Sequence, residues 1–293
     1  MRRGRYYLGR VIKLGQLDQN MLMDAIAKSP TLTIGKFAWT ITDVADEREN
    51  NPPFVFGRLS KFTREGHVTI VDTSSKSQVD ALAENLLVAS SPFVYLPEYS
   101  GIAYLHVWNG IQEEIFPRRF KSIIEATYDG FFVDCSIEPV SDYKAFTSKL
   151  REIDLFTEIS AKVYPPNPLF GRLWGSLKDY VKKRNATELS VKESSEEGKG
   201  IKTNIINLMV GIMENPQYEP EQEADITDAA LLMSADGYGR GKVVGESKGN
   251  EVIIRTTETQ KSFLHTKEPV PEKLAQESSK HFRKISKERD MDH

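Results

Sequence analysis

The sequence predicts an α+β fold with a mixed, mainly antiparallel sheet and several packed amphipathic helices. First, residues 131–164 contain an apolar β-branched run, then apolar residues at helical spacing, then an alternating run. Second, short alternating runs separated by Gly, Pro and Asp turns fill much of residues 1–108. Third, amphipathic helical patterns recur on both sides of residues 131–164. We therefore expect the main sheet to be built around residues 131–164.

These central residues are expected to form a strand, a helix and a second strand. Ser141 follows Pro139 and stands where a helix N-cap belongs, because its hydroxyl can accept a bond from a free backbone N–H. Helical spacing is shown by Tyr143, Phe146, Leu150 and Ile153. Strict alternation follows at Thr157, Ile159, Ala161 and Val163. Since a helix joins the two strands, they can lie parallel in one sheet, and we predict a central βαβ unit.

The chain before this unit is predicted to consist mainly of strands. The expected strands cover residues 5–14, 37–42, 54–62 and 67–71. A short helix should begin after Asp18, which has the side chain of an N-cap. A further amphipathic helix is indicated by the spacing of Val79, Leu82, Leu86 and Leu87. A hairpin around PEYSG should connect strands at residues 93–95 and 102–108.

Helices become more frequent in the rest of the chain. Pro117 opens, or nearly opens, a helix whose apolar face is Phe116, Phe120, Ile123 and Ile124. Further helices are expected over residues 169–184 and 201–212, with a possible strand at 188–193 between them. Short apolar runs at residues 229–233, 242–246 and 251–257, separated by glycine turns, predict a small antiparallel hairpin unit.

Length and composition limit the domain organisation. With 293 residues, of which 39% are hydrophobic, the chain can hold one large domain or two ordinary ones. We predict an α+β domain over residues 1–168, a helical and hairpin region over 169–266, and a charged tail, partly helical or disordered, over 267–293. The single cysteine, Cys135, excludes a disulfide within the chain and should be a buried thiol. Because no apolar run is long enough for a membrane span, we expect a soluble cytoplasmic protein.

Two motifs that can mark ligand sites have a simpler explanation. The glycines between Gly237 and Gly241 could let backbone N–H groups approach a phosphate, but the Walker spacing and a following helix are missing. A hairpin turn is the favoured interpretation of this segment. The five histidines have no metal-ligand spacing to one another or to the cysteine. We therefore expect neither a metal nor a cofactor.

An acidic group in the central unit supports one enzymatic hypothesis. A metal-dependent nuclease needs clustered carboxylates with a lysine beside them, so that the metal activates water while the lysine stabilises charge. The candidates are Asp134, Glu138, Asp142, Lys144, Glu158 and Lys162. The even spacing from Asp134 to Glu138 puts both on one face of their strand, and the same holds for Glu158 and Lys162. Charges at a sheet edge explain the pattern adequately and are the favoured interpretation, so the nuclease is an alternative.

Dispersed cations near aromatic residues indicate a different function. The net charge is −3, from 39 basic and 42 acidic residues, so a polyanion would have to meet a local basic face. Lys and Arg contact backbone phosphates without any sequence motif. The predicted nucleic-acid contacts are Arg3, Arg5, Arg10, Lys13, Arg118, Arg119, Lys121, Lys182, Lys183 and Arg184. The last three also suit the end of a helix, where cations complement the helix dipole.

Several stretches carry a resemblance to a known family. An opening YYLGRVIKL strand, a KFAWTI strand, a PFVFGRLSKF strand, a PFVYLPEYSGIAYLHVW hairpin and a VDCSIEPV strand followed by ISAKVYPPNP appear in this order. Across residues 5–168 this order of elements resembles the phage exclusion proteins typified by RexA of phage lambda, and uncharacterised bacterial proteins of similar length from phage-defence loci. The resemblance implies a non-enzymatic, dimeric DNA-binding protein that acts in phage exclusion, with a membrane effector encoded elsewhere. Residues beyond Leu169 depart from the pattern.

The leading hypothesis is therefore sequence-nonspecific DNA binding in anti-phage defence, by a homodimer that prefers duplex to single-stranded DNA. The second hypothesis is a non-catalytic interaction subunit of a defence complex, which should expose an apolar patch near Leu173, Trp174 or Phe282. The third is the nuclease, which predicts that Asp134, Glu138 and Lys162 converge in a cleft.

Overall fold

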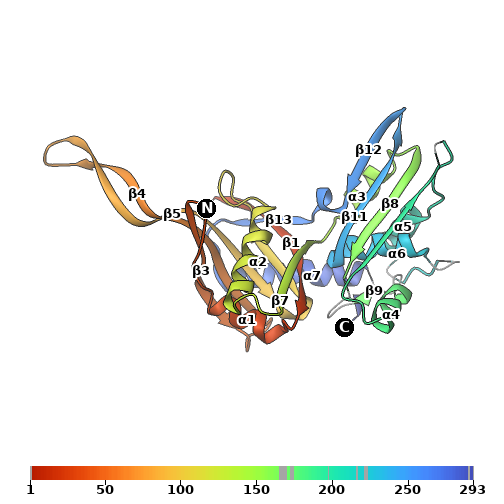
Figure 1. Cartoon of the computed structure of the whole chain (residues 1–293), viewed down its shortest axis with the longest axis horizontal. Coiled ribbons are helices and arrows are strands. Elements are labelled where there is room, and N and C mark those ends of the chain that lie inside the picture. The colour runs from red at the N-terminus through yellow and green to blue at the C-terminus, as the bar shows by residue number, and fades with distance from the viewer. Residues whose placement is uncertain are drawn as a thin grey trace.

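The computed structural model describes residues 2–164, 170–171, 175–196, 198–215, 217–220, 224–289 and 291–292. Figure 1 shows two lobes side by side and a long hairpin that projects from the first lobe. Antiparallel sheets and helices pack together in both lobes, so the predicted α+β class is confirmed.

The first lobe is built on an eight-stranded sheet. Its order is β13-β1-β6-β5-β4-β3-β2, and β7 also pairs with β1. The strands are β1 (Arg3–Gly15), β2 (Leu32–Ile34), β3 (Phe37–Glu47), β4 (Phe54–Asp72), β5 (Ser77–Leu96), β6 (Gly101–Leu105), β7 (Val133–Pro139) and β13 (Ser262–Thr266). β1 pairs along its length with β13, β6 and β7, so it is the central strand of this lobe. The predicted hairpin around PEYSG is confirmed by the antiparallel pairing of β5 with β6.

Helices α1 (Gln19–Ala27) and α2 (Ile115–Thr127) cover one face of this sheet. Asp18 caps α1 as predicted, because its carboxylate accepts a hydrogen bond from the backbone N–H of Met21 at 2.8 Å. The apolar face predicted for α2 is also confirmed, and it is fully buried: Phe116, Phe120, Ile123 and Ile124. Spacing of apolar residues was sufficient here because the whole stripe faces one sheet.

The second lobe is a four-stranded antiparallel sheet backed by helices. Its order is β10-β8-β11-β12, with bounds β8 (Leu155–Val163), β10 (Leu189–Ser194), β11 (Gly239–Ser247) and β12 (Asn250–Arg255). The helices of this lobe are α3 (Tyr143–Leu150), α4 (Gly175–Lys183), α5 (Ile205–Glu214) and α6 (Ile226–Met233). Alternate residues Ile159, Ala161 and Val163 of β8 are buried on the helix side. The intervening residues of β8 therefore face outward.

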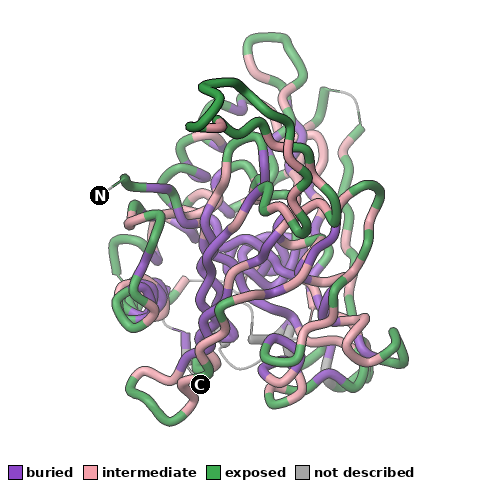
Figure 2. The backbone as a smooth tube through the Cα atoms, turned by 90° about the vertical axis from the view of Figure 1, so that its left-hand side faces the viewer, coloured by how far each residue is buried: buried purple, intermediate pink, exposed green. Residues whose placement is uncertain are grey.

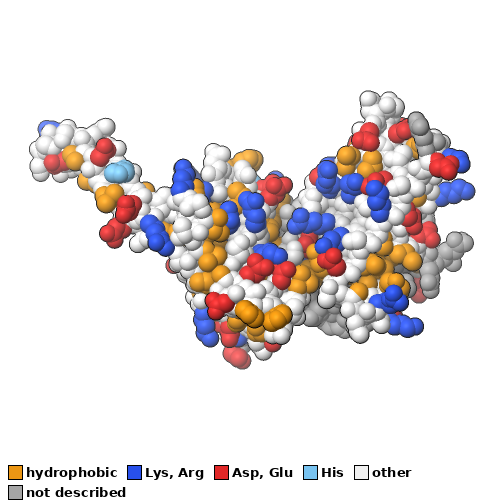
Figure 3. Space-filling model, viewed as in Figure 1, with side chains coloured by type: hydrophobic (Ala, Val, Ile, Leu, Met, Phe, Trp, Pro, Cys, Tyr) orange, Lys and Arg blue, Asp and Glu red, His pale blue; other side chains and the backbone are white. Residues whose placement is uncertain are grey.

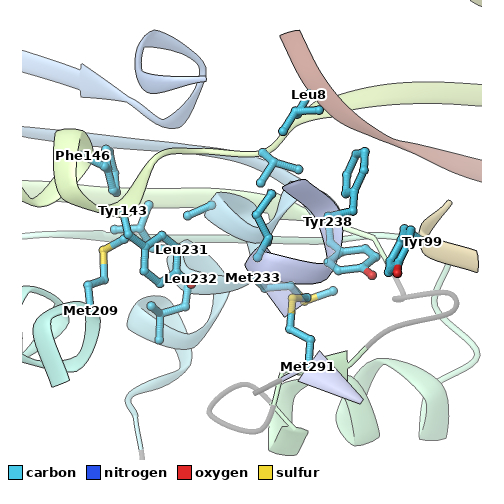
Figure 4. Close-up of a cluster of buried hydrophobic side chains, with 14 of the residues drawn as sticks. Leu8, Tyr99, Tyr143, Phe146, Met209, Leu231, Leu232, Met233, Tyr238 and Met291 are labelled. Carbon is cyan, nitrogen blue, oxygen red and sulfur yellow. The ribbon is translucent and has the colours of Figure 1, made fainter. Parts of the chain in front are cut away.

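One hydrophobic core extends through both lobes. It includes Tyr6 of β1, Phe146 of α3, Ile159 of β8 and Phe282 of α7 (Pro271–Glu288). Figure 2 shows the buried residues gathered in the middle of the molecule, and Figure 4 shows Leu8, Tyr143 and Tyr238 among the side chains of this cluster. The remaining short elements are η1 (Pro97–Tyr99), η3 (Ser234–Tyr238), η4 (Thr256–Thr259), β9 (Phe170–Gly171) and β14 (Met291–Asp292).

The predicted parallel βαβ unit is wrong. Strand β7, helix α3 and strand β8 follow one another as predicted, but β7 pairs with β1 in the first sheet while β8 pairs with β10 and β11 in the second. Helix α3 is thus the crossing between two sheets, and every strand pair in the described residues is antiparallel. The N-cap of α3 is Asp142, which accepts from Ala145 N, whereas the Ser141 hydroxyl donates to the Thr256 carbonyl.

Residues 79–87 form a strand instead of the predicted helix. β4 continues through the turn expected near residues 64–66 and pairs with β5 from Asp72↔Ser77 back to Val55↔Tyr95. β3 pairs with β4 only as far as Phe62, so the hairpin leaves the sheet as a two-stranded ribbon (Figure 1). We call residues 63–87 the arm. Helical spacing was misleading because apolar residues stand on both faces of this ribbon.

Other predictions beyond residue 168 are also corrected. The expected helix start at Leu169 lies outside the described residues, but Phe170–Gly171 form a strand and α4 begins at Gly175. Residues 229–233 lie in helix α6 and not in a hairpin, although β11 and β12 do form one. The glycine segment is neither a hairpin turn nor a phosphate loop, because it leads from a helix into β11. The charged tail is mostly the packed helix α7.

The predicted domain division stays a prediction. Strand pairs cross both proposed boundaries, since β8 pairs with β11 and β13 pairs with β1. No helix in the described part of the chain is both long and apolar enough to cross a lipid bilayer. The predicted cellular compartment also stays a prediction.

Candidate nucleic-acid interface

The outer face of the second sheet carries five cations. Alternation along each strand places them opposite the buried, helix-facing residues. They are Lys162 of β8, Lys192 of β10, Arg240 and Lys242 of β11, and Arg255 of β12. We call this set the cationic sheet face. Register aligns Lys192, Lys242 and Arg255 in one row across the sheet, and Lys162 with Arg240 in the next.

The cationic sheet face forms a shallow hollow of about 550 Å³. All five cations line it, together with the hydroxyl residues Ser160, Ser190 and Thr257. Among the described residues, neither a carboxylate nor an aromatic side chain lines this hollow. It is therefore a surface that offers positive charge and hydrogen-bond donors to an anion.

Each cation has a carboxylate partner at the rim of the hollow. The nitrogen–oxygen distances are 2.7 Å for Lys162–Glu188, 2.6 Å for Lys192–Glu158, 2.5 Å for Lys242–Glu158, 2.8 Å for Arg240–Glu138 and 3.3 Å for Arg255–Glu258. The two lysines hold the pKa of Glu158 below its usual value, and hydrogen bonding to Glu188 raises the pKa of Lys162. The five cations thus share four carboxylates.

A cleft of about 830 Å³ between the two sheets continues the cationic sheet face. Arg240, Arg255 and Thr257 line both hollows. The opposite wall of the cleft includes Arg5 of β1, whose Nη1 donates to Ser262 Oγ at 3.0 Å, and Arg118 of α2. The cleft also contains glutamates 113, 114 and 258, so its charge is mixed. Figure 3 shows Lys and Arg side chains in the valley between the lobes.

The structure brings together only part of the predicted site. Arg5 and Arg118 reach the cleft. Arg3 is exposed at the start of β1, while Lys183 and Arg184 are exposed at the end of α4. The side chain of Lys182 lies outside the described residues. Three of the ten predicted cations thus remain on the surface away from the cleft, and two line it.

Arg10 is wrongly predicted as a phosphate contact. It is fully buried, because β1 is a central strand with both faces covered. Its Nε donates to the Asp236 carbonyl at 2.9 Å, and its Nη1 donates to the Tyr99 carbonyl at 2.7 Å. The guanidinium carbon lies 5.0 Å from the centre of the Tyr238 ring. Arg10 therefore holds the core together.

Lys13 is also turned inward, and this has a measurable consequence. Its ammonium group donates to Gln19 Oε1 at 3.0 Å and Ser100 Oγ at 2.6 Å, and burial lowers the pKa of Lys13 to about 8. In the unfolded chain the lysine keeps its proton up to its usual pKa of 10.5. Because the unfolded state then binds more protons, the free energy of unfolding should rise with pH between these two values.

Urea denaturation of wild type and Lys13→Met across this pH range tests the effect. We expect the difference in free energy of unfolding, wild type minus variant, to increase as the pH rises from about 8 to 10.5. The comparison with the variant cancels the titration of buried tyrosines, whose raised pKa values act in the opposite direction. Parallel pH profiles of the two proteins would contradict the inward, desolvated position of Lys13.

The basic group predicted on α2 does not form a free basic face. The Arg119 guanidinium carbon lies 5.2 Å from the centre of the Trp39 ring, and burial lowers the pKa of Arg119. Lys121 Nζ lies 2.6 Å from Asp134 and 3.5 Å from Glu125. Two of the three cations of this group are thus occupied by neighbours, and only Arg118 faces the cleft.

The acidic group of the nuclease hypothesis is dispersed. Asp134 pairs with Lys121, Asp142 caps α3, and Glu138 accepts from Ser136 and Arg240. Within the described ranges, no group of three or more His, Cys, Asp and Glu side chains could hold a metal ion.

The single cysteine is buried as predicted. Burial raises the pKa of the Cys135 thiol, which is fully enclosed.

The apolar patch expected for an interaction subunit does not include Phe282, which is fully buried. Leu173 and Trp174 lie outside the described residues.

The cationic sheet face was missed because its members come from four strands. Alternation around Lys192 and Lys242 indicates outward side chains, but only the strand register shows that they meet.

A family model matches most of this chain. Residues 20–210 match the model of a family described as "Domain of unknown function (DUF4747)", which is more than half of the chain. Lys162 and Lys192 lie inside the matched region, and the cations of β11 and β12 lie outside it. No curated protein matches the chain.

Proposed function

Because the chain belongs to the DUF4747 family, whose function is unknown, we propose a function from its geometry: sequence-nonspecific binding of duplex DNA through the phosphates. The observation that supports this most is the hollow on the cationic sheet face, which five cations and no carboxylate line among the residues that the structure describes. This surface stands on a chain whose net charge is −3, so the local charge is opposite to the global one.

The spacing of the cations suits a row of phosphates. Neighbouring strands lie ~4.8 Å apart, so the row from Lys192 through Lys242 to Arg255 spans roughly 14 Å across the four strands. One strand of a DNA duplex carries a phosphate about every 3.4 Å along the helix axis, so this row faces roughly four phosphates. Lys and Arg contacts of this kind position a protein on DNA without reading its sequence.

The carboxylates at the rim do not prevent such binding. The exposed pairs Lys162–Glu188 and Arg255–Glu258 contribute only about 0–1 kcal/mol each, because both charges remain well hydrated. Glu138 and Glu158 are much less exposed, so Arg240, Lys192 and Lys242 are held more firmly by their carboxylates. A phosphate that replaces a rim carboxylate keeps the cation paired, and the displaced counterions add a favourable entropy. Lys192 and Lys242 share Glu158, so one of them can turn to a phosphate while the other stays paired.

The composition of the hollow favours duplex over single-stranded DNA. Proteins that bind single strands without sequence preference stack bases on aromatic side chains. The described lining of the hollow contains serine and threonine hydroxyls in place of such side chains. The anti-phage role rests on the resemblance to phage exclusion proteins, and it stays a prediction together with a membrane effector as partner.

Binding to a labelled random duplex across a salt series tests this proposal. Each neutralised phosphate contributes about −0.9 to the slope of log K against log salt, so five contacts predict a slope of roughly −4.5. The variant Lys162→Gln with Arg255→Gln should bind more weakly, with a slope shallower by about 1.8. These two cations are chosen because their partners Glu188 and Glu258 are also solvent-accessible, so folding should be unaffected.

The matched control removes two cations from another exposed surface. Lys280→Gln with Lys284→Gln lowers the net charge equally but lies on α7, away from the cationic sheet face. We expect wild-type affinity and slope for this control. Equal losses of DNA affinity in both double variants would mean that net charge alone explains the binding. Absence of binding by wild type at low salt would refute the proposal. Loss of the duplex only with magnesium would favour the nuclease.

A further inference from the structure

One face of β4 can be followed from the sheet to the end of the arm, past a register shift between Lys61 and Phe62 where β5 has one extra residue. At its base, the even-numbered residues Arg58, Ser60, Phe62 and Arg64 of β4 line a hollow of about 940 Å³. The same alternation continues onto the arm, where Gly66, Val68 and Ile70 follow and register pairs them with Ala83, Ala81 and Val79 of β5. We call this arm surface the apolar arm face.

The apolar arm face has no cover within the described chain. Ile70 is 50% exposed and Val79 is 43% exposed. The opposite face of the arm mixes polar and apolar residues: it carries His67, Thr69 and Asp80, and also the exposed residues Val71 and Leu82. A two-stranded hairpin alone in water is marginally stable, and it normally needs a further layer against its apolar face. An uncovered apolar ribbon of this kind indicates a binding surface.

We infer that the arm of a second copy of this chain covers this face, with the two arms antiparallel about a two-fold axis. The axis passes through the middle of the apolar arm face near Val68, so Val68 meets Val68 of the other copy, and Ile70 meets the Gly66 and Ala83 end of that copy. The turn at the end of each arm, residues 72–77, then lies over the hollow at the base of the other arm. This inference is independent of DNA binding.

Charge and polarity of the two ends support this arrangement. The apolar arm face from Gly66 to Ile70 and from Val79 to Ala83 carries no charge, so two copies meet without repulsion. The turn is polar and holds one carboxylate, Asp72, and one ammonium group, Lys76. Within the hollow Arg58 already pairs with Asp43 at 3.1 Å and Glu268 at 2.7 Å, so the charge offered to Asp72 is that of Arg64. The hydroxyl residues Thr31, Thr40, Thr42, Ser60 and Ser90 complete the lining. Each end of the arm can therefore pair with the other.

The size of the surface is compatible with a dimer. From Arg58 to Asp72 the hairpin is roughly 50 Å long, and its two strands are about 10 Å wide. Face-to-face packing then covers roughly 500 Å² on each copy, or about 1,000 Å² together, which is near the lower end for specific protein interfaces. The predicted homodimer thus has a defined surface, and the cationic sheet face on the other lobe stays free (Figure 1).

Sedimentation of the full chain over a concentration series tests the inference. Wild type should sediment as a dimer, and Ile70→Lys should sediment as a monomer because it buries a charge at the dimer interface. The matched control Thr69→Lys adds the same charge one residue away on the opposite face and should stay dimeric. Equal melting temperatures would show that all three fold. A monomeric wild type, or a dimeric Ile70→Lys, would overturn the inference.

Disulfide formation tests the antiparallel orientation. Thr31→Cys places a thiol in the hollow, and Ser75→Cys places one in the turn of the arm. The native Cys135 is fully buried and does not interfere. A mixture of the two variants should form a disulfide between copies, whereas neither variant alone should do so. Cross-linking of Ser75→Cys with itself would show arms joined tip to tip and would refute the antiparallel arrangement.

Discussion

Replacing Asp236 by alanine is expected to lower the free energy of unfolding by roughly 3–5 kcal/mol, because it leaves a buried arginine without its counter-charge. The Asp236 carboxylate accepts from Arg289 Nη1 and from the Tyr143 hydroxyl, both at 2.7 Å. The side chains of Arg289 and Asp236 are each only 3% exposed. The Arg289 guanidinium carbon also lies 3.9 Å from the centre of the Tyr143 ring. This contact joins η3, α3 and the end of α7.

Chemical denaturation of three variants would measure this contribution. The surface pair Lys280–Glu277 on α7, at 3.3 Å, provides the control, and Lys280→Ala should cost less than about 0.5 kcal/mol. The double variant Asp236→Leu with Arg289→Met should recover much of the loss, because neither partner then leaves an uncompensated charge. A cost below about 1 kcal/mol for Asp236→Ala would mean that the pair is hydrated and not part of the core.

Truncating Phe282 to alanine is expected to lower the free energy of unfolding by about 3–5 kcal/mol, as for other large buried aromatic residues. Phe282 is fully buried on α7 and stacks on Tyr99, with ring centroids 5.6 Å apart and an interplanar angle of 12°. Its ring lies so close to Gly101 that a Cβ there would stand 2.6 Å from Phe282 Cζ. Helix α7 therefore packs directly on the backbone of β6 at Gly101, and the Phe282 ring fills the space between them.

Thermal or urea unfolding of Phe282→Ala, compared with Phe131→Ala, separates burial from residue type. Phe131 is 73% exposed, so its truncation should change the free energy of unfolding by less than about 0.5 kcal/mol. Phe282→Leu should lie between the two, since it keeps part of the apolar volume. Equal effects of Phe282→Ala and Phe131→Ala would show that α7 is not docked as described.

Local patterns predicted local structure well. The apolar stripe of α2 and the Asp18 cap of α1 are formed as expected, because spacing and capping depend only on residues within a few positions. The strand–helix–strand order around α3 is also correct. The arm shows the limit of this reasoning, since Val79 and Leu82 suit a helix by spacing but pair in a hairpin with β4.

Nonlocal pairing decided which charges meet. Arg10 and Lys13 were predicted as phosphate contacts from their charge alone, but the partners of β1 come from residues 101–105, 133–139 and 262–266 and enclose it. No feature near Arg10 in the sequence shows that strands from the far end of the chain will cover it. Of the ten cations predicted from charge alone, only Arg5 and Arg118 therefore line the cleft.

The sequence by itself determined the α+β class, most helices and strands of the first lobe, and the buried state of Cys135. These follow from periodicity, composition and capping, which act over a few residues. Only the tertiary structure decided that α3 connects two sheets, that the arm leaves the sheet, and that cations from four strands form one face. Each of these depends on which distant strands pair and in what register, and alternation specifies a face of a strand but not its neighbour.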